Sequence, residues 1–242
     1  MKLSDFDYIL PKDLIAQYPL KDRAAARLMV VDRKTGDFSH LFFEDINGYL
    51  KKEDLVVLND TRVLTCRLIG RKSTGGKVEV LLTRRKNGSV FEALIQPSRT
   101  KIGERINFGG TGVCGIITNR REISFSLKDA QIIYELGQVP LPPYIKREPE
   151  EMDKDYYQTI YARSPGAIAS PTAGLHFTQG ILDALEGRGV RVSCLTLHVG
   201  LGTFKPVTCE DVTAHRMEKE FFKVPEALQK EIKTAKEMKS RI

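Results

Sequence analysis

The sequence predicts an α/β main domain that carries an inserted small antiparallel β-barrel domain. Residues 1–61 mix helix and strand signals, and the mixed pattern returns in residues 131–242. Between them, residues 62–130 hold short β-rich runs separated by glycine-bearing or polar turns, with no convincing helix. Short strands at this spacing are typical of a small barrel or sandwich. We therefore expect a discontinuous main domain that is interrupted by the barrel.

The first part of the main domain begins with helix signals after Pro11 and continues with two β-rich runs, 28–32 and 38–43. A glycine-bearing turn lies between these runs, which predicts a β-hairpin. The run Leu55–Leu58 is apolar at every position, as in a strand that is buried on both faces. Polar residues 59–62 follow it directly, and the end of a buried strand suits a binding site.

The inserted region is recognised by four short β-rich runs, which are residues 77–82, 90–95, 112–118 and 122–127. Turn formers such as Asn87 and Gly88 separate them. Between Arg67 and Arg121 the basic residues greatly outnumber the acidic ones. A basic domain of this kind indicates either a phosphate-rich partner or a charge surplus that only keeps a small barrel in solution.

The second part of the main domain opens with the proline-rich stretch Pro140–Tyr144, which is expected to be stiff and extended because proline fixes its own φ. Residues 148–155 are acidic, and we expect a solvent-exposed loop or the start of a helix there. A short amphipathic helix is predicted around Ile181–Leu185, with a glycine stop after it. A strand is predicted at Val192–Val199, and Pro225 opens a last helix.

Composition restricts the class of protein. The chain has 38 Lys and Arg residues against 31 Asp and Glu residues, a formal net charge of +7, which is mild evidence for a polyanionic partner. No apolar run approaches the roughly 20 residues that span a bilayer, and acids interrupt the N-terminal stretch where a signal peptide is apolar. We therefore expect a cytoplasmic protein. Four cysteines are expected as free thiols: Cys66, Cys114, Cys194 and Cys209.

Three stretches concentrate the residue types that carry chemistry. The first, residues 59–62, is either a site or a capped turn, since Asn, Asp and Thr are good turn formers. The second, residues 170–178, contains His176, which either titrates near neutrality in a site or is a hydrogen-bonded structural residue. The third, residues 197–204, brings His198 and two glycines to the end of a predicted strand.

The glycines of the third stretch, Gly200 and Gly202, could cradle a phosphate, a ribose or a carboxylate. A dinucleotide fingerprint needs a third glycine three residues on, where this chain has Lys205, so a Rossmann site is excluded. The histidines do not pair at helical spacing, and no cysteine or carboxylate completes a zinc set, so no metal is expected. A Ser-His-Asp hydrolase would need a nucleophile elbow, which the sequence lacks.

Seven stretches stand in a fixed order along the chain, namely residues 4–8, 22–28, 58–63, 140–145, 157–162, 171–178 and 197–204. Together they resemble the S-adenosylmethionine:tRNA ribosyltransferase-isomerase family of queuosine biosynthesis. Each motif alone is weak, but seven in register are specific, and the resemblance covers essentially the whole chain. Family members continue beyond the position of Ile242, so we expect family sequence that this chain does not contain.

The resemblance implies an α/β domain with an inserted antiparallel barrel, and a reaction that uses S-adenosylmethionine as a substrate and no cofactor. The ribosyl part of S-adenosylmethionine moves to the 7-aminomethyl-7-deazaguanine base at the tRNA wobble position, and adenine and methionine leave. The sugar rearranges to give epoxyqueuosine. The implied partners are tRNA and S-adenosylmethionine, with no membrane, and the protein is expected to be a monomer.

The resemblance also indicates which residues act. Those expected near the reacting centre are Asp60, Arg62, His176 and His198. Those expected to bind or shape the substrate pocket are Asn59, Thr61, Thr172, Gly174, Gly200, Gly202 and Thr203. Candidates for phosphate contacts in the barrel are Arg71, Lys72, Arg84, Arg85, Lys86, Arg99, Lys101, Arg120 and Arg121. The alternatives are a non-catalytic RNA-binding protein that uses the barrel, and a metal-free nucleoside hydrolase or transferase acting on small molecules.

Overall fold

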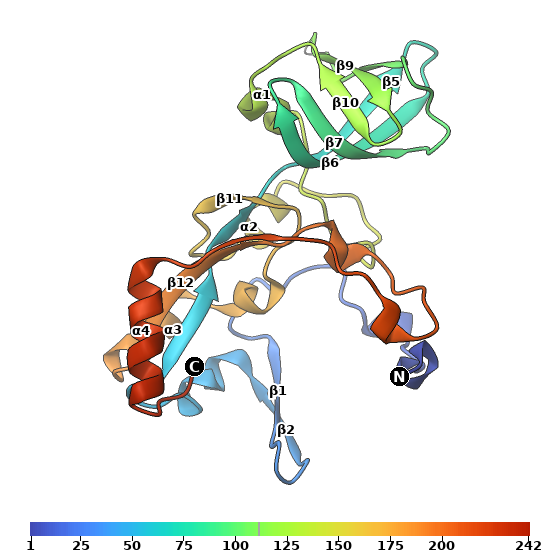
Figure 1. The fold of residues 1–242 in the computed structure, drawn as a ribbon. Helices are drawn as coiled ribbons and strands as arrows, with labels where there is room; N and C mark the ends of the chain where they lie inside the picture. Colours follow the sequence, from blue (N-terminus) through green and yellow to red (C-terminus); the bar gives the residue numbers. More distant parts are fainter. Residues whose placement is uncertain (111) are drawn as a thin grey trace.

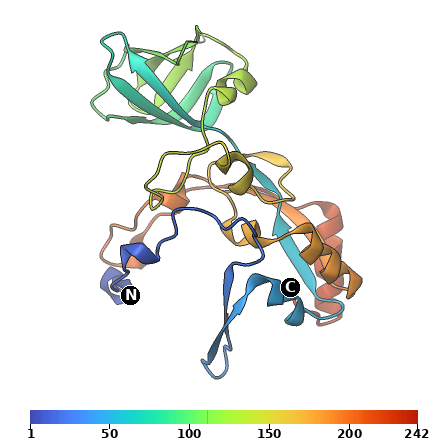
Figure 2. The ribbon, with the colours of Figure 1, turned by 180° about the vertical axis from the view of Figure 1, so that it is seen from behind.

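The structure is a computed structural model that describes residues 1–110 and 112–242. A β-barrel forms one end of the molecule, and a main part built from the two ends of the sequence forms the other (Figure 1). Seen from behind, the same division is clear, and the N-terminal segment lies beside a later loop of the chain (Figure 2). The backbone N–H of Leu3 donates to the carbonyl of Glu210 in that loop.

The barrel is closed and antiparallel, with the strand order β10-β7-β6-β5-β8-β9. Its strands are β5 (Arg67–Lys72), β6 (Lys77–Asn87), β7 (Val90–Gln96), β8 (Arg105–Asn107), β9 (Cys114–Asn119) and β10 (Glu122–Phe125). Inward and outward residues alternate along β6 and β7, which is the pattern that predicted strands here. The predicted small barrel is confirmed.

Two barrel strands, β5 and β8, were not expected from the sequence. Gly70 interrupts the apolar pattern of β5, and the structure shows why the glycine is needed. A Cβ on Gly70 would lie 2.4 Å from a side-chain carbon of Ile106, which belongs to β8. β5 and β8 are paired neighbours in the barrel, and the side chains of Ile106 and Phe108 fill the space beside Gly70. The interruption therefore marks a place where another strand packs closely.

The barrel core also includes a helix that follows the last strand. The helix α1 (Ala130–Glu135) begins at Asp129, whose side chain accepts from the backbone N–H of Gln131. Its fully buried Ile133 packs into the same cluster as Phe91 and Leu68 of the barrel. The helix therefore belongs with the barrel, although its residues extend past position 130.

The chain enters and leaves the barrel through two segments that touch. Before the barrel, β4 (Thr61–Val63) pairs in parallel with β11 (Ser164–Ala167) outside it, so the expected boundary between residues 61 and 62 falls inside a strand of the main part. After the barrel, Gly137 lies directly against the backbone of Thr65. A Cβ at this glycine would lie 1.8 Å from the Thr65 carbonyl oxygen, so only glycine fits at this contact.

The main sheet has the order β13-β12-β3. The strands β3 (Leu55–Asn59) and β12 (Arg191–His198) are parallel, and β13 (Phe221–Lys223) pairs antiparallel with β12. Leu55 and its neighbour at position 57 face α4 (Glu226–Glu237), whereas Leu58 packs with the cluster around α3 (Gln179–Gly187). The prediction of a strand buried on both faces is confirmed.

The predicted hairpin consists of β1 (Arg27–Val31) and β2 (Phe38–Phe42), and it projects from the main part. Short helical segments complete the chain. They are the 3-10 helices at Leu3–Phe6, Lys12–Leu14, Phe43–Gly48, Thr172–His176, Leu201–Phe204 and Val212–Ala214, and the helix α2 (Asp153–Tyr156). All four cysteines are free, as expected. Across positions 1–110 and 112–242, no helix has both the length and the apolar character required to cross a bilayer.

The contact between the two barrel linkers gives a stability prediction. We expect Gly137→Ala to lower the free energy of unfolding by about 1–3 kcal/mol, because the new methyl group meets backbone that has to move. Urea or thermal unfolding measures the change. The matched control is Gly187→Ala at the end of α3, where the added carbon meets nothing within 4 Å and alanine favours the helix. Equal stability of the two variants would contradict the close approach.

Candidate active site

A cluster of polar side chains lies where the parallel strands β3 and β12 end. Asp60 directly follows β3, and its carboxylate is buried. The Thr196 hydroxyl of β12 donates to Asp60 Oδ1 over 2.7 Å, and an Arg163 guanidinium nitrogen lies 3.2 Å from Asp60 Oδ2. The Thr196 hydroxyl also lies 3.3 Å from the Ser164 hydroxyl. The strand ends therefore bring a carboxylate, a cation and two hydroxyls together, and we call this the strand-end cluster.

The imidazole of His198 completes the strand-end cluster. Its Nδ1 lies 2.7 Å from the Thr61 hydroxyl oxygen, and its ring stacks on Phe221 with centroids 5.2 Å apart. Burial lowers the pKa of His198 below its ordinary value, and nearby Asp60 offsets part of that effect. The ring is therefore held in place and is neutral at pH 7, which is the form that can accept a proton.

Gly166 allows the chain to pack closely against the imidazole. A Cβ at this position would lie 2.4 Å from His198 Nε2, so any larger residue would collide with the ring or displace it. Since Nδ1 is engaged by Thr61, Nε2 is the nitrogen left for a ligand or a proton. Gly166 was not predicted from the sequence, because nothing local to residues 164–167 indicates contact with a histidine more than thirty positions later.

Asn59 fixes the geometry of the two strand ends. Its side-chain oxygen accepts from the backbone N–H groups of Thr61 and Leu197, over 3.1 and 2.9 Å, and its side-chain nitrogen donates to the Leu197 carbonyl. These bonds tie the residues on either side of Asp60 to the residue before His198. Asn59, predicted to bind substrate, therefore acts first as a positioning residue.

The glycine turn after β12 engages a carboxylate of the chain itself. The backbone N–H of Gly200 donates to Glu220 Oε1 over 2.7 Å. A Cβ at Gly202 would lie 3.2 Å from the Glu218 Cβ, so this glycine allows close packing of the two segments. Thr203 is exposed on the short helix that follows. One backbone N–H of the turn thus already binds a carboxylate of the chain itself, and substrate binding by Gly200, Gly202 and Thr203 stays a prediction.

The second predicted histidine lies in a different place. His176 packs against Phe43, with ring centroids 5.3 Å apart, and it lines a cavity of about 530 Å³ together with Thr172. We call this the tyrosine cavity, because its walls include Tyr18, Tyr144, Tyr156 and Tyr157. Among the described residues, no hydrogen bond or ring contact joins His176 to the strand-end cluster. The structure thus does not combine the two imidazoles into one constellation.

Two further predicted residues take up other positions. Arg62 is exposed on β4, where it pairs through its backbone with Pro165. Gly174 is buried at a close approach, since a Cβ there would lie 2.2 Å from the Tyr161 hydroxyl oxygen. Gly174 therefore allows the second motif to pack against the segment that contains Tyr161.

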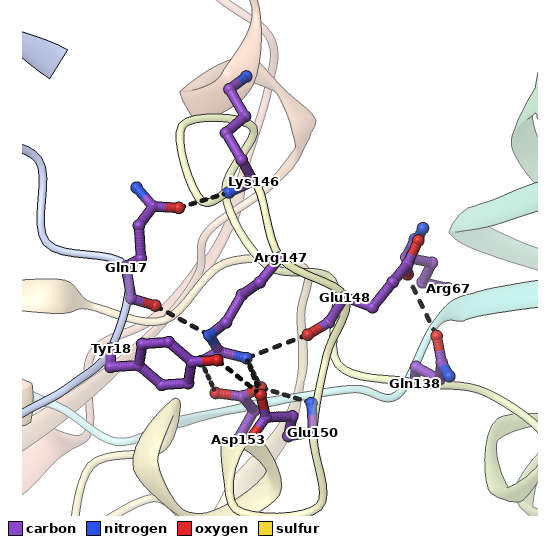
Figure 3. A network of polar contacts seen from close by, with 9 residues as sticks. All are labelled: Gln17, Tyr18, Arg67, Gln138, Lys146, Arg147, Glu148, Glu150 and Asp153. Atoms are coloured by element: carbon purple, nitrogen blue, oxygen red, sulfur yellow. Dashed lines mark hydrogen bonds and ion pairs between the residues drawn. The ribbon is translucent and has the colours of Figure 1, made fainter. Parts of the chain in front are cut away.

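An ion-pair network forms one wall of the tyrosine cavity (Figure 3). Arg147 donates to both oxygens of Asp153, over 2.6 and 2.7 Å, and to the carbonyl of Gln17 over 2.9 Å. Burial alone would raise the pKa of Asp153, but hydrogen bonds from Arg147 and the Glu150 N–H lower it. Residues 148–155 were expected to form a solvent-exposed loop or the start of a helix, and α2 does begin at Asp153. Asp153 itself is only 3% exposed, because its carboxylate is covered where it pairs with Arg147.

The same segment is linked to the barrel. Arg67 of β5 forms ion pairs with Glu79 of β6, over 2.9 Å, and with Glu148, over 2.8 Å. The Glu79 hydrogen bond, with Glu148 adding to it, raises the pKa of Arg67. These residues line a cavity of about 640 Å³ between the barrel and the main part, and we call it the junction cavity. Both cavities are lined by Leu141, Pro142, Ile145 and Arg147, so these residues lie between the junction cavity and the tyrosine cavity.

The basic residues of the barrel fall into two groups. Arg84 and Lys86 pair with Glu92 and Glu122, over 2.5 and 2.6 Å, and Lys72 lies 3.6 Å from Glu104. Arg71 and Arg85 donate to backbone carbonyls. The remaining candidates, which line a hollow of about 750 Å³ that we call the basic hollow, are Arg99, Lys101, Arg120 and Arg121.

The residues of the basic hollow differ from the others in their charge balance. Arg99, Lys101 and Arg120 form no ion pair with any other described residue, and no carboxylate lines the hollow. Their charge is therefore available to a ligand, whereas the charges on Arg84 and Lys86 are already balanced. For the described part of the chain, no group of three or more histidine, cysteine or acidic residues is arranged to hold a metal ion.

Comparisons with known proteins fit these observations. The model of the family described as queuosine biosynthesis protein matches residues 3–242. An S-adenosylmethionine:tRNA ribosyltransferase-isomerase of Sulfurihydrogenibium sp. is 46% identical over 248 residues, which cover 100% of this chain and 74% of the relative. The enzyme of the same name from Syntrophotalea carbinolica is 46% identical over 251 residues, covering 100% of this chain and 73% of the relative.

A solved structure of an S-adenosylmethionine tRNA ribosyltransferase from Thermotoga maritima is 29% identical, with a TM-score of 0.45, and the match covers 99% of this chain and 68% of that one. The chain thus spans about three quarters of the length of the curated relatives. The family match and the sequence identities confirm the resemblance seen in the motifs. The chain belongs to the queuosine biosynthesis family, as an enzyme of the tRNA ribosyltransferase-isomerase type.

Proposed function

We propose that this enzyme transfers the ribosyl moiety of S-adenosylmethionine to the 7-aminomethyl-7-deazaguanine base at the tRNA wobble position and isomerises it. The product is epoxyqueuosine-tRNA, and adenine and methionine are released. The names of the relatives support the substrates and the reaction class. Within the structure, the observation that carries the proposal is the strand-end cluster, where a buried carboxylate and a neutral imidazole meet. A reaction on tRNA places the enzyme in the cytoplasm.

The chemistry needs three kinds of group. A base removes an acidic proton beside the sulfonium, an acid assists the departure of adenine, and hydroxyl-bonding groups hold the ribose. His198 is the proposed base, acting through Nε2, because its imidazole is neutral and Nδ1 is held by Thr61. Asp60 is proposed to hold the ribose hydroxyls, since a carboxylate accepts two hydrogen bonds at once.

The other predicted residues act around this centre. Arg62 and Arg163 are proposed to meet the anionic part of a substrate at the rim, because both side chains are exposed. His176 contacts substrate in the tyrosine cavity and does not share proton transfer with His198. Holding both substrates in register supplies a large part of the rate in a two-substrate reaction of this kind.

The reaction is tested with S-adenosylmethionine labelled in the ribose. We expect adenine and methionine to be released, and the label to enter RNA, only with tRNA that bears the deazaguanine base. Unmodified tRNA is the control. Turnover without any tRNA would indicate a small-molecule enzyme instead, and binding of tRNA without release of methionine would indicate a non-catalytic RNA-binding protein.

The role of His198 is tested by substitution. We expect His198→Ala to reduce kcat at least about tenfold, or roughly 1.4 kcal/mol of barrier, with the fold retained. His40→Ala, on the exposed face of the β1–β2 hairpin, is the matched control and should keep full activity. Gly166→Ala should also reduce kcat, because its methyl group would collide with the imidazole. Full activity of His198→Ala would remove this histidine from the mechanism.

The pH dependence gives a second readout for the same residue. Burial lowers the pKa of His198, so the neutral, proton-accepting form persists below pH 6.5. We expect kcat/KM to fall on the acidic side only as pH drops through that lowered pKa, which places this limb below pH 6.5. The limb should disappear from the residual activity of His198→Ala. A limb that is unchanged in the variant would belong to another group.

The tRNA surface is proposed to include the basic hollow, because Arg99, Lys101 and Arg120 form no ion pair with another described residue. We expect the triple variant Arg99→Ala, Lys101→Ala, Arg120→Ala to raise the KM for tRNA and to reduce the slope of its logarithm against log salt by roughly two units. The KM for S-adenosylmethionine should stay unchanged. The control is Arg84→Ala with Lys86→Ala, whose charges are balanced by Glu92 and Glu122. If the control pair weakens tRNA binding more than the triple variant, the surface is misplaced.

A further inference from the structure

The tyrosine cavity has the dimensions and the lining of a small-molecule site that is separate from the strand-end cluster. Its volume of about 530 Å³ lies within the roughly 300–1,000 Å³ of ordinary ligand pockets. Its walls are mainly apolar, with four tyrosines and a few polar groups from different segments. Tyr18 and Tyr144 are 57% and 48% exposed, so much of their ring surface is uncovered. Uncovered aromatic faces in a concave site are platforms on which flat rings stack.

Arginines hold two of the four tyrosines, Tyr18 and Tyr156, in place. The Arg147 guanidinium lies 4.4 Å from the ring centre of Tyr18, and the Arg23 guanidinium lies 5.3 Å from that of Tyr156. Tyr18 also donates its hydroxyl hydrogen to Glu150 over 3.0 Å. Figure 3 shows Arg147 between Tyr18 and Asp153. Tyr18 is thus ordered without a ligand, so little entropy is lost at this side chain when a ring binds.

The same arginines are not available as anion receptors. Arg147 is saturated by Asp153 and by the Gln17 carbonyl, and burial lowers the pKa of Arg23, which donates to three backbone carbonyls. Among the arginines of the cavity, Arg27 is exposed, and its side chain forms neither an ion pair nor a hydrogen bond with another described residue. The interior therefore favours an uncharged flat ring, with an anionic group of the same ligand able to reach Arg27.

Two polar side chains on the wall can form hydrogen bonds with the edge of such a ring. His176 and Thr172 line the cavity, and neither side chain hydrogen-bonds to another described residue. Both can donate and accept. A purine-type ring offers this combination, because its faces stack and its edge carries both donors and acceptors. Phosphate or a simple sugar would leave the tyrosine faces unused.

We propose that the tyrosine cavity binds the purine-type ring of a substrate, stacked on Tyr144 and Tyr18 and hydrogen-bonded at its edge by His176 and Thr172. The inference rests on the proposed function, which supplies two ligands with such a ring: the adenine of S-adenosylmethionine and the deazaguanine of the tRNA. Each also carries an anionic group, the methionyl carboxylate or a backbone phosphate, that Arg27 can meet.

The test measures binding apart from catalysis. Isothermal titration calorimetry is carried out with S-adenosylmethionine and, separately, with 7-aminomethyl-7-deazaguanosine. Tyr144→Ala removes a stacking face, and Ala16→Trp places an indole at an exposed position of the cavity lining. The matched controls are Tyr144→Phe, which keeps the ring, and Ala227→Trp on the exposed side of α4. Thermal melts of all four variants verify that each is folded.

We expect Tyr144→Ala and Ala16→Trp each to weaken binding of one probe at least about tenfold, the scale of a lost stacking contact, while both controls stay within twofold of wild type. Loss for S-adenosylmethionine assigns the cavity to adenine, and loss for the deazaguanosine assigns it to the tRNA base. Unchanged affinity for both probes in both cavity variants, or no binding of either probe to wild type, would overturn the inference.

The two proposals fail separately. Methionine release on deazaguanine-bearing tRNA by the wild-type enzyme, together with cavity variants that bind both probes normally, would leave the reaction standing and remove the cavity. Binding of a probe that depends on Tyr144, without any methionine release by wild type, would keep the ring site and remove the proposed reaction.

Discussion

The parallel pairing of β3 with β12 is the contact on which the site depends. Residues more than a hundred positions apart reach hydrogen-bonding distance only because these strands lie side by side and end at the same level. Helices cover the sheet on both faces, so its register is set by two apolar surfaces at once. Asn59 fixes how the ends of the two strands are aligned, because its side chain forms three hydrogen bonds to the backbone of Thr61 and Leu197. A slip of one residue would point Asp60 away from Thr196.

Much of the fold could be predicted from local patterns. The hairpin, the doubly buried strand β3, the last helix and most of the barrel follow from apolar periodicity and turn residues, because each depends on neighbours in sequence. Strand β5 was not predicted because Gly70 interrupts its apolar pattern. The glycine is required there by the side chain of Ile106 on another strand, which local sequence does not show. The acidic stretch 148–155 was expected to be an exposed loop or a helix start, and α2 begins there, but composition does not reveal that Asp153 is buried by its pairing with Arg147. Local sequence describes elements well and their partners poorly.

The candidate site illustrates the same limit. Asp60, Thr61 and His198 were singled out from the sequence and do meet in the structure, because each closes a predicted strand. Thr196 stands two positions before His198 on that strand, and the period of two was a signal that could have found it. The expectation that both imidazoles share one centre had no local evidence, and the structure assigns His176 to a separate cavity. Counting cations in the barrel likewise could not separate balanced charges from unbalanced ones.

The large sequence separation within the strand-end cluster has a consequence for how the chain folds. Thr196 and Asp60 are 136 residues apart, so their contact closes a long loop, and loops of that length form late because closure entropy opposes them. The barrel occupies the middle of this loop, and its strand pairings all lie within Arg67 to Phe125, so each closes a much shorter loop than the contact of Thr196 with Asp60. We therefore expect the barrel to form before the main sheet, and the contact of Thr65 with Gly137 then holds the two halves of the main domain close together. The inserted barrel thereby lowers the loop-closure entropy that opposes pairing of β3 with β12.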